Sequence, residues 1–413
     1  MSEQKGVLLV TQGFPFGESE RSFLGEEFDQ LQSCFKTTVL AYGKSDGLLY
    51  PAPEKVPLYR YEFAGIQPFS LLRQFIRPEV RSDIRAACKT GSAKTRMIRF
   101  GKILSYSLRA EQLEAQMHEI VEEENIEIIY TYWCTQATIT ALRLKKKFPR
   151  LKVVTRLHGY DLYIERTEMA WQVMRGFVAQ RCDRLFFVCD AGREYFCEHW
   201  PMVELHKCTA AYLGTRALQV DRWGTPDKNR LAIISCSNII PLKRVALIAE
   251  ALAVLPEEIQ VTWNHIGGGE LYNSTIEYTT RLLHTKSNIQ WKFWGRIANN
   301  KLEEIYNRVE PQLFITTSSS EGLPVSIQEA FSIGIPAIGT AVGGNSELIQ
   351  NGVTGFLLTP DPSPQEVADQ IVRFYKLSFE QKADMQNAVK KLWQEKCNSK
   401  KNADILMKIL KKL

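Results

Sequence analysis

Short apolar runs alternate with amphipathic stretches from one end of the chain to the other. Between the runs, stretches such as Leu242–Leu255 and Lys382–Cys397 carry apolar residues at helical spacing. This alternation predicts an α/β protein with parallel sheets covered by helices on both faces. Eleven expected strands suit two sheets of five or six: Val7–Thr11, Thr37–Ala41, Ile126–Tyr132, Val153–Leu157, Leu185–Val188, Leu231–Ser235, Val261–Ile266, Ile289–Trp294, Leu313–Thr317, Pro336–Thr340 and Gly355–Leu358.

A polar segment divides these strands into two groups. Residues 214–230 contain two glycines and one proline and come directly before a new strand at Leu231. We therefore expect a domain at 1–213, a linker at 214–230, a domain at 231–393, and a lysine-rich helix at 394–413 that returns to the first domain. Ligands bind beyond the carboxyl ends of parallel strands, so two facing Rossmann-like domains predict an active site in an interdomain cleft.

Composition excludes several classes of protein. The chain has 413 residues, and 52 basic against 46 acidic side chains give a formal charge of +6. No apolar run approaches the roughly 20 residues that span a bilayer. The run near the N-terminus is too short for the core of a signal peptide, so it is interpreted as the first strand.

The nine cysteines form no CxxC pair, and an odd number with many in apolar runs indicates reduced thiols in a cytoplasmic protein. One cluster brings together Cys182, Cys189, Cys197, His199, His206 and Cys208. Structural zinc sites show tight pairs of ligands, which this cluster lacks. We predict buried thiols and surface histidines there, and no metal site.

The most informative segment is residues 318–347, SSSEGLPVSIQEAFSIGIPAIGTAVGGNSE. A strand leads into Glu321 and Gly322, and a helix from Val325 follows the Leu323-Pro324 pair. The free amides and positive dipole end of that helix suit a diphosphate. Glu329 lies about two turns into the helix, so Glu321 and Glu329 can contact opposite ends of one extended ligand.

This segment resembles the E-x7-E region of the retaining GT-B glycosyltransferases of family 4, the glycosyl transferases group 1. The resemblance covers nearly the whole chain and is most specific over residues 231–358. It implies that Glu321 holds the donor sugar, that Glu329 holds the ribose, and that Gly322 and Leu323 contact the donor.

Two further segments of the second domain resemble donor-binding parts of this family. In SCSNIIPLKR, residues 235–244, Lys243 matches a lysine that contacts the donor diphosphate. The family's arginine, five residues earlier, is replaced by Asn238. The neighbouring Arg244 has the charge to compensate, but its side chain is expected to point elsewhere. HIGGG at 265–269 resembles a glycine turn, and FWGRI at 293–297 implies base contacts from Arg296 and Ile297.

The first domain carries the candidates for the acceptor side. His158 follows a strand in RLHGYDLY and matches a family histidine beside the reacting centre. Asp161 is expected to orient this loop or to touch the acceptor. In QGFPFGESE, residues 12–20, Gly17 is the candidate for close contact with the acceptor, and Glu18 and Glu20 are candidates to bind sugar hydroxyls.

A basic stretch runs from Arg73 to Arg109 with apolar residues interleaved. Its acids are only Glu79 and Asp83, against ten cations: Arg73, Arg77, Arg81, Arg85, Lys89, Lys94, Arg96, Arg99, Lys102 and Arg109. This pattern favours a peripheral contact of residues 73–109 with an anionic membrane. A solvated helix face and a nucleic-acid patch are the alternatives, and the chain carries no nucleic-acid-binding motif.

Together these features predict a metal-independent retaining hexosyltransferase without a cofactor, because the nucleotide-sugar is a co-substrate. UDP- or GDP-sugars are the expected donors, and a saccharide or lipid-linked saccharide of a bacterial surface polysaccharide is the expected acceptor. The enzyme is expected in the cytoplasm, on the inner face of the membrane. The rival hypotheses are a catalytically weak homologue acting as a partner subunit, a dinucleotide-dependent oxidoreductase, whose GxGxxG motif is missing, and a nucleic-acid-binding protein.

Overall fold

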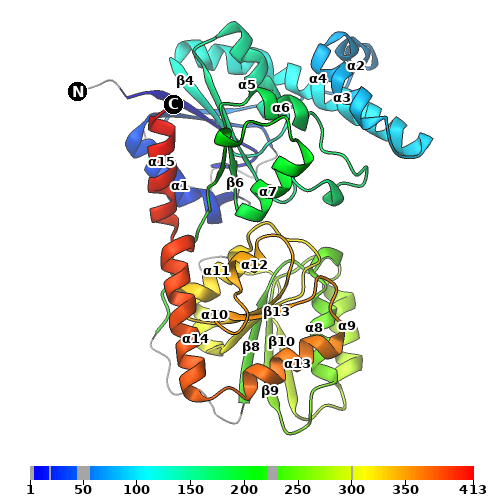
Figure 1. Cartoon of the computed structure of the whole chain (residues 1–413), viewed down its shortest axis with the longest axis vertical. Helices are drawn as coiled ribbons and strands as arrows, with labels where there is room; N and C mark the ends of the chain where they lie inside the picture. The colour runs from blue at the N-terminus through cyan, green and yellow to red at the C-terminus, as the bar shows by residue number, and fades with distance from the viewer. Residues whose placement is uncertain (1–3, 18–19, 44–55, 222–229, 299–300) are drawn as a thin grey trace. The chain divides into compact units, whose positions relative to one another are not determined.

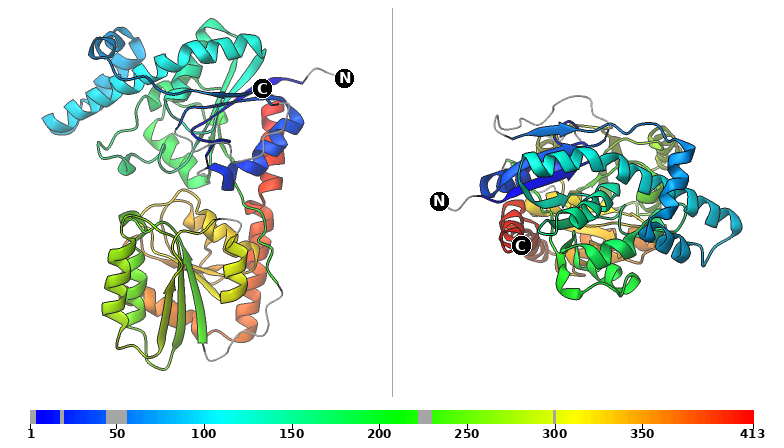
Figure 2. Two further views of the ribbon diagram at one scale, coloured as in Figure 1. Left: turned by 180° about the vertical axis from the view of Figure 1, so that it is seen from behind. Right: turned by 90° about the horizontal axis from the view of Figure 1, so that it is seen from above.

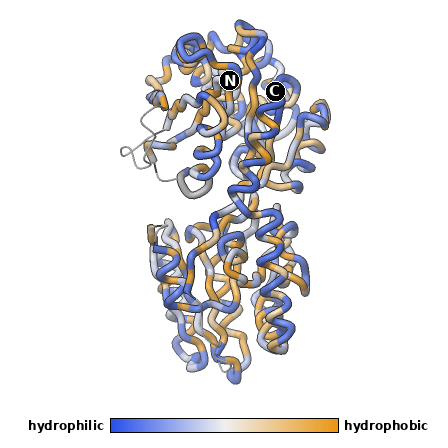
Figure 3. The backbone as a smooth tube through the Cα atoms, turned by 90° about the vertical axis from the view of Figure 1, so that its left-hand side faces the viewer, coloured by the Kyte–Doolittle hydropathy of each residue, from blue (hydrophilic) through white to orange (hydrophobic). Residues whose placement is uncertain are grey.

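The chain folds into two compact units, one of which is built from two separate segments of the sequence. The computed structural model describes residues 4–17, 20–43, 56–221, 230–298 and 301–413. The first unit comprises Met1–Leu213 and Lys400–Leu413, and the second comprises Gly214–Ser399 (Figure 1). In each unit, apolar segments run through the interior strands and hydrophilic segments lie on the outer helices (Figure 3).

The first unit contains a seven-stranded parallel sheet whose central strands are buried along their whole length. Its order is β3-β2-β1-β4-β5-β6-β7. Strands buried on both faces are nearly all apolar, as in the β1 sequence GVLLVT. The strands are β1 (Gly6–Thr11), β2 (Lys36–Ala41), β3 (Leu58–Arg60), β4 (Ile126–Thr131), β5 (Lys152–Leu157), β6 (Arg184–Phe187) and β7 (Cys208–Ala210).

Helices cover this sheet, and the last one comes from the C-terminal end of the chain. In α15, Ala403, Leu406, Met407 and Leu410 follow the i, i+3, i+4, i+7 pattern and are all at most 3% exposed. This helix lies beside α1 (Figures 1 and 2). The helices are α1 (Arg21–Cys34), α2 (Pro68–Arg73), α3 (Pro78–Ala87), α4 (Ala93–Glu123), α5 (Gln136–Lys147), α6 (Arg175–Arg181), α7 (Asp190–His199) and α15 (Ser399–Lys411), with single turns η2 (Gln74–Ile76), η3 (Ile164–Arg166) and η4 (Leu205–Lys207).

The second unit repeats this architecture with six parallel strands in the order β10-β9-β8-β11-β12-β13. Helices α8, α9 and α13 lie on one face of the sheet, and α10, α11 and α14 lie on the other (Figure 1). The strands are β8 (Arg230–Cys236), β9 (Gln260–Ile266), β10 (Ile289–Phe293), β11 (Leu313–Thr316), β12 (Ala337–Thr340) and β13 (Gly355–Leu358). The helices are α8 (Val245–Ala253), α9 (Tyr272–Leu283), α10 (Leu302–Val309), α11 (Val325–Ser332), α12 (Asn345–Leu348), α13 (Pro364–Tyr375) and α14 (Phe379–Leu392), with the turns η5 (Pro241–Lys243) and η7 (Trp393–Cys397).

Both strand orders reverse direction at one place, next to the first strand of each sheet. In the first sheet the reversal lies between β1 and β4, and in the second it lies between β8 and β11. Loops that leave such strands diverge to opposite faces, which opens a crevice at the carboxyl end of the sheet. From the fold alone, we therefore expect ligands to bind at the loops after β1, β4, β8 and β11.

The eleven expected strands are all present, and two short edge strands, β3 and β7, were not expected. The first sheet therefore has seven strands instead of five or six. The amphipathic stretch 242–255 begins with the turn η5 before α8, and α14 begins three residues before the expected Lys382. The expected domain ends at 213 and 393 compare with unit boundaries after Leu213 and after Ser399.

The chain passes between the units twice, and the two passages are hydrogen-bonded to each other. The Thr215 amide donates to Cys397 at 2.7 Å, and the Ser399 amide donates to Thr215 at 3.2 Å. The Trp393 indole also donates to the Thr215 hydroxyl at 2.9 Å. Gly214, at φ +79°, allows this close approach, because a Cβ there would lie 2.6 Å from the Ser399 nitrogen.

Candidate active site

The loops that follow β8, β9 and β10 stack against one another at the carboxyl end of the second sheet. The Ser237 amide donates to Ile266, and the Ile239 amide donates to Gly268 at 2.7 Å. A Cβ on Gly267 would lie 1.9 Å from the Ser237 carbonyl oxygen, so only glycine fits there. The HIGGG turn therefore fixes the path of the loop that carries Asn238.

A buried histidine supports the same loop from below. The Ser235 hydroxyl lies 2.8 Å from His265 Nδ1, and His265 Nε2 lies 3.2 Å from the Ser237 carbonyl oxygen. The Trp263 indole donates to the Ser235 hydroxyl at 2.9 Å. Burial lowers the pKa of His265 to about 4, so the ring is neutral and donates from Nε2 to Ser237.

Lys243 and Glu321 form an ion pair at the reversal of the second sheet. Lys243 Nζ lies 2.5 Å from Glu321 Oε1, and both side chains are largely shielded from solvent. Lys243 comes from the η5 turn after β8, and Glu321 comes from the loop after β11. The Ser319 amide donates to the Leu242 carbonyl at 2.8 Å and ties the two loops together. Two residues singled out on separate motifs therefore meet.

Arg244 does not compensate for the missing arginine, because its guanidinium is fully engaged away from Lys243. It donates to the carbonyls of Thr317, Ser318 and Pro360, and it pairs with Asp361 at 2.7 Å. Its backbone, at φ +46°, turns the chain from η5 into α8. The prediction that the Arg244 side chain points elsewhere is confirmed, and this side chain joins the loops after β8, β11 and β13.

The double glycine after β12 closes the Glu321 loop. The Gly344 amide donates to the Gly322 carbonyl at 2.7 Å. Gly343 has φ +50°, and a Cβ there would lie 2.0 Å from the Glu321 carbonyl oxygen. The loop then enters α11, whose first amides have no acceptor within the helix and form an anion-binding end beside Gly322 and Leu323.

Glu329 is a partly buried carboxylate on α11. Burial raises its pKa to about 7. Its charge reaches Cys236 at the end of β8 and Tyr306 on α10. Burial and then Glu329 raise the pKa of Cys236, and burial, then Cys236, then Glu329 raise that of Tyr306. Glu329 is therefore poised to exchange a proton near neutral pH.

The remaining candidates for donor contacts lie on the loops after β8 and β10. Asn238 and Arg296 are exposed, and Ile297 is half-buried. The Arg296 backbone nitrogen would lie 3.6 Å from a Cβ on Gly268, so the segment after β10 lies against the glycine turn. The structure thus gathers the loops that carry these residues at the carboxyl ends of β8, β9 and β10.

In the first unit, Glu20 organises the loop after β1. Its carboxylate accepts the amides of Gln12, Gly13 and Phe14 and the indole N–H of Trp133, and the residue is 2% exposed. The hypothesis that Glu20 binds sugar hydroxyls is wrong, since its lone pairs are already taken by the protein. Glu18 lies outside the described residues. Gly17 has room for a close contact, because a Cβ there would meet no atom nearer than 3.7 Å.

His158 follows β5 and is buried against aromatic rings. Its ring lies 4.0 Å from that of Trp133 and 5.1 Å from that of Tyr132, measured between centroids. Neither ring nitrogen has a hydrogen-bond partner. Such orphaned nitrogens are uncommon in a buried side chain, and they leave His158 able to bind a ligand group.

Asp161 holds the His158 loop in place. Its carboxylate accepts the His158 amide at 2.6 Å and the Cys134 amide at 2.8 Å. Burial opposes ionisation, but the hydrogen bond and charge of His158, followed by Arg175 and the Cys134 amide, keep the pKa of Asp161 below its usual value. Of the two expected roles, this geometry supports orientation of the loop.

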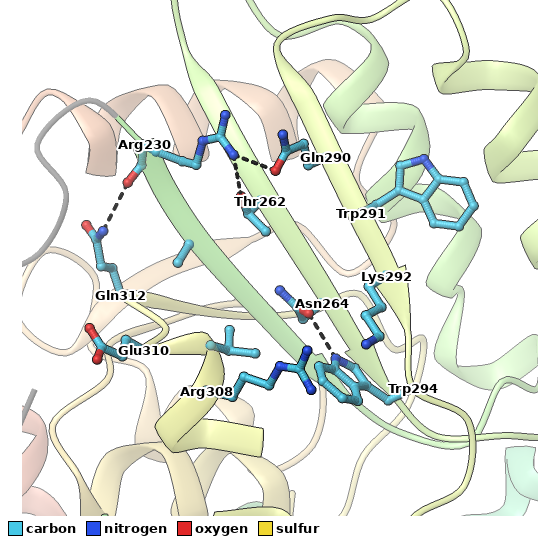
Figure 4. Close-up of a pocket in the computed structure, with 12 residues that line it drawn as sticks. Arg230, Thr262, Asn264, Gln290, Trp291, Lys292, Trp294, Arg308, Glu310 and Gln312 are labelled. Carbon is cyan, nitrogen blue, oxygen red and sulfur yellow. Dashed lines mark hydrogen bonds between the residues drawn. The ribbon is translucent and has the colours of Figure 1, made fainter. Parts of the chain in front are cut away.

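A hollow of about 410 Å³ lies on the face of the second sheet that α10 only partly covers (Figure 4). Side chains from the strands line the hollow. They include Arg230 on β8, Thr262 and Asn264 on β9, and Lys292 on β10. No residue predicted to contact the donor lines it, so it is distinct from the Lys243–Glu321 pair.

The cysteine and histidine cluster supplies thiols that do not pair. None of the nine cysteines forms a disulfide, and burial raises the pKa of Cys208 to about 12, with Cys197 as the next cause. Within the described part of the chain, no group of three or more histidine, cysteine or acidic residues is arranged to hold a metal ion.

Sequence reasoning missed two residues that shape these loops, His265 and the inward-facing Glu20. A signal existed for His265, because a histidine at the end of a buried strand and next to three glycines resembles the position of His158. No comparable signal existed for Glu20, since nothing in the sequence distinguishes an acid that caps its own loop from one that faces solvent.

Comparison with known proteins gives the same assignment for the second unit. Residues 220–392 match the family described as Glycosyl transferases group 1. The chain is 26% identical over 275 residues to N-acetyl-alpha-D-glucosaminyl L-malate synthase of Bacillus anthracis, which covers 64% of this chain and 69% of that protein. It is also 26% identical over 173 residues to the GtfA subunit of a peptide N-acetylglucosaminyltransferase of Streptococcus agalactiae, 31% of that protein.

The whole fold matches solved structures at low sequence identity. Anabaena Alr3699/HepE with UDP and glucose has a TM-score of 0.64 at 16% identity, over 99% of this chain and all of that one. The apo lipopolysaccharide outer core galactosyltransferase WaaB has a TM-score of 0.67 at 13% identity, with the same coverage. The fold and the donor loops define a nucleotide-sugar-dependent glycosyltransferase with the GT-B fold. Residues 220–392 match the glycosyl transferases group 1, and the protein is a retaining glycosyltransferase.

Proposed function

We propose that the protein transfers a hexose from a UDP- or GDP-sugar to a saccharide or lipid-linked saccharide acceptor in the assembly of a bacterial surface polysaccharide. The observation that carries this proposal is the Lys243–Glu321 pair at the reversal of the second sheet. Related proteins support its direction, since a putative colanic acid biosynthesis glycosyltransferase of Salmonella typhimurium is 31% identical over 70 residues. A structure of Anabaena HepE contains UDP-glucose.

The donor is held by groups that each match one part of it. Lys243 and the amides at the start of α11, beside Gly322 and Leu323, bind the diphosphate. Glu321 accepts hydrogen bonds from hydroxyls of the donor sugar, and Glu329 accepts them from the ribose. The backbone of Arg296 and Ile297 contacts the base, and Asn238 contributes a neutral amide.

Transfer breaks the bond between C1 of the sugar and the diphosphate oxygen and forms a bond from C1 to the acceptor oxygen. The acceptor proton passes to the departing diphosphate, on the same face of the sugar. Negative charge grows on the diphosphate in the transition state, where Lys243 and the α11 amides already point. Because these groups supply the positive charge, we expect transfer to continue in the presence of EDTA.

The first unit supplies the acceptor side of the reaction in this proposal. His158 acts on the donor sugar during transfer, and Asp161 holds its loop. Its ring nitrogens make no hydrogen bond within the protein, and Nδ1 lies 3.9 Å from Asp161 Oδ2. Gly17 leaves room for the acceptor in the loop after β1. Nine cysteines without a disulfide are in keeping with work in the cytoplasm, where thiols stay reduced.

A catalytically weak homologue is the second candidate, and Asn238 favours it. The side chain is exposed and neutral where a charged contact to phosphate would lie. Such a protein would bind a nucleotide-sugar without transferring or hydrolysing it.

A thermal-shift screen of UDP- and GDP-sugars, followed by a transfer assay with the donors that bind, tests the proposal. A donor that binds the folded state raises Tm by mass action. The shift should be lost in Lys243→Ala and kept in Lys292→Ala, which removes an exposed lysine from the hollow on the same unit. Binding without turnover would favour the weak homologue, and an equal shift in both variants would refute the Lys243 assignment.

A further inference from the structure

Residues 66–102 of the first unit carry an unusual concentration of exposed apolar side chains. They form α2, η2, α3 and the first third of α4, which project from one side of the first unit (Figures 1 and 2). Fifteen large hydrophobic residues of the described chain are exposed, and seven of them belong to this segment. They are Ile66, Phe69, Leu72, Phe75, Ile76, Met97 and Ile98.

The helix α2 and the turn η2 expose apolar side chains. Helix α2 has no buried residue, and Phe69 and Leu72 are 82% and 65% exposed. The buried residue of η2 is the polar Gln74, which donates to Glu111 and accepts from the Ser107 hydroxyl. A folded protein gains stability by burying apolar groups, so this cluster of exposed apolar side chains indicates that something else covers the surface.

Within residues 66–102 the exposed charges are all positive. Glu79 and Asp83 are the only acids between residues 63 and 110, and both are buried. Glu79 pairs with Arg143, and Asp83 accepts the Met174 amide at 2.9 Å. Arg73 is exposed and pairs with Glu111, and the other exposed cations are Arg81, Arg85, Lys89, Lys94, Arg96 and Lys102.

This surface is held rigidly by the body of the unit. Arg99, which the sequence suggested as one of the surface cations, is 5% exposed, and that prediction is wrong. Its guanidinium donates to the carbonyls of Ala87, Thr90, Met169 and Ala170. Arg99 therefore clamps the α3–α4 turn onto the loop that follows η3.

We propose that this face, with the exposed apolar residues Phe69, Leu72 and Ile76 and the exposed cations Arg81, Arg85 and Lys89, docks on an anionic lipid bilayer. The apolar side chains enter the boundary between headgroups and acyl chains, and the cations contact lipid phosphates. Exposed cations with no exposed acid among residues 66–102 suit a negatively charged surface. The exposed apolar side chains argue against nucleic acid, whose contacts with protein are dominated by phosphates and hydrogen bonds.

Within the part of the chain that the structure describes, no helix combines the length and apolar character needed to cross a membrane. Docking would therefore be peripheral and reversible. The proposal goes beyond the proposed function and does not depend on it, since the face lies outside the loops that carry the donor residues.

Co-flotation of the full chain with vesicles tests the proposal. We compare vesicles of phosphatidylcholine alone with vesicles that also contain phosphatidylglycerol, at low and high salt. The wild type should bind the anionic vesicles at least about tenfold better, and high salt should weaken this binding. The triple variants Phe69→Ser, Leu72→Ser, Ile76→Ser and Arg81→Glu, Arg85→Glu, Lys89→Glu should each lose roughly tenfold or more.

Matched variants remove equally exposed residues elsewhere. Phe379→Ser with Leu205→Ser removes side chains that are 72% and 70% exposed, and Lys391→Glu with Lys408→Glu reverses exposed charges. These controls should keep wild-type binding, and circular dichroism should show that every variant folds.

Three outcomes would overturn the proposal: no binding of the wild type to anionic vesicles, equal loss in the controls, or no loss in either triple variant. If the serine variant instead changes the molar mass in solution without any vesicle binding, the face is an interface between proteins. Thermal shift by nucleotide-sugars should be the same in all variants, so failure here and failure of the proposed function are distinguishable.

Discussion

Lys243 and Glu321 neutralise each other in the structure, although each is assigned to a different part of the donor. The lysine has to exchange a carboxylate partner for a diphosphate when the donor binds. The pair therefore keeps the lysine in position but also competes with the ligand.

The first prediction follows from this competition. Glu321→Gln should strengthen the binding of free UDP or GDP by several-fold, on the order of 1 kcal/mol, because Lys243 loses its partner. The same change should lower transfer about a hundredfold or more, since the contact with the donor sugar is lost. Calorimetry of nucleotide binding and a transfer assay check the two halves. Weaker nucleotide binding in the variant would show that the pair does not compete with the ligand.

The second prediction concerns the pH dependence of donor binding. A ribose hydroxyl donates best to an ionised Glu329, whose pKa burial raises to about 7. Binding therefore favours the deprotonated form, and nucleotide affinity should rise roughly tenfold between pH 6 and pH 8. Glu329→Gln should bind with an affinity that is nearly flat over this range. A titration of UDP at several pH values checks this, and an unchanged pH profile in the variant would separate Glu329 from the ribose.

Most donor residues could be predicted because each lies on a motif with its own local signature. The pairing of Lys243 with Glu321 could not, since it depends on two loops 78 residues apart meeting at one strand reversal. The direction of Arg244 could be expected from its place next to Lys243, but its partners could not. They are the carbonyls of Thr317, Ser318 and Pro360, which lie more than 70 residues away in the sequence.

At the scale of elements, close backbone approaches determine which loops can support the site. Gly343 and Gly352 both have positive φ, but only Gly343 faces another backbone, with the Glu321 carbonyl 2.0 Å from an added Cβ. Nothing lies within 4 Å of the corresponding position at Gly352. Substitution of Gly352 therefore tests backbone strain alone, whereas substitution of Gly343 adds a steric clash.

The third prediction uses this difference. Gly343→Ala should displace the Glu321 loop and lower transfer by more than about tenfold, because neither backbone can yield cheaply. Gly352→Ala carries only the strain of positive φ, about 1 kcal/mol, and should keep full activity. Transfer assays with the unfolding midpoint of each variant make the comparison. Equal activity in both variants would remove Gly343 from the support of the site.

The central strands were predictable because a strand buried on both faces is an apolar run of fixed length. The edge strands β3 and β7 have three residues each and only partly buried or exposed side chains, so no such run marks them. Helix α14 was anticipated three residues late, since its start depends on the Ser378–Gln381 capping box rather than on apolar spacing. The apolar pattern therefore does not predict elements whose bounds depend on tertiary contacts or on capping.

At the scale of the whole molecule, the first unit depends on a helix that the sequence places last. Leu406 in α15 is 1% exposed, whereas the adjacent Ile405 is 47% exposed. The two residues differ little in size and share one helix. They therefore form a natural pair for measuring what α15 contributes.

The fourth prediction is that Leu406→Ala lowers the free energy of unfolding of the first unit by about 2–5 kcal/mol, because it leaves a cavity in a packed interior. Ile405→Ala should cost less than about 0.5 kcal/mol. Hydrogen exchange followed by mass spectrometry reads each unit separately, and peptides of the second unit should be unaffected. Equal exchange in the two variants would mean that α15 is not part of the first unit's core.

The split construction of the first unit also sets an order for folding during synthesis. All strands of the second unit, with its residues from Gly214 to Ser399, leave the ribosome before α15 does. The second unit can therefore complete its core while the first still lacks one of its helices. A chain without α15 would have a folded second unit and an incomplete first unit. The apolar surface that α15 covers would then be exposed to chaperones and proteases. Residues 400–413 therefore complete a hydrophobic core whose other residues lie before position 214.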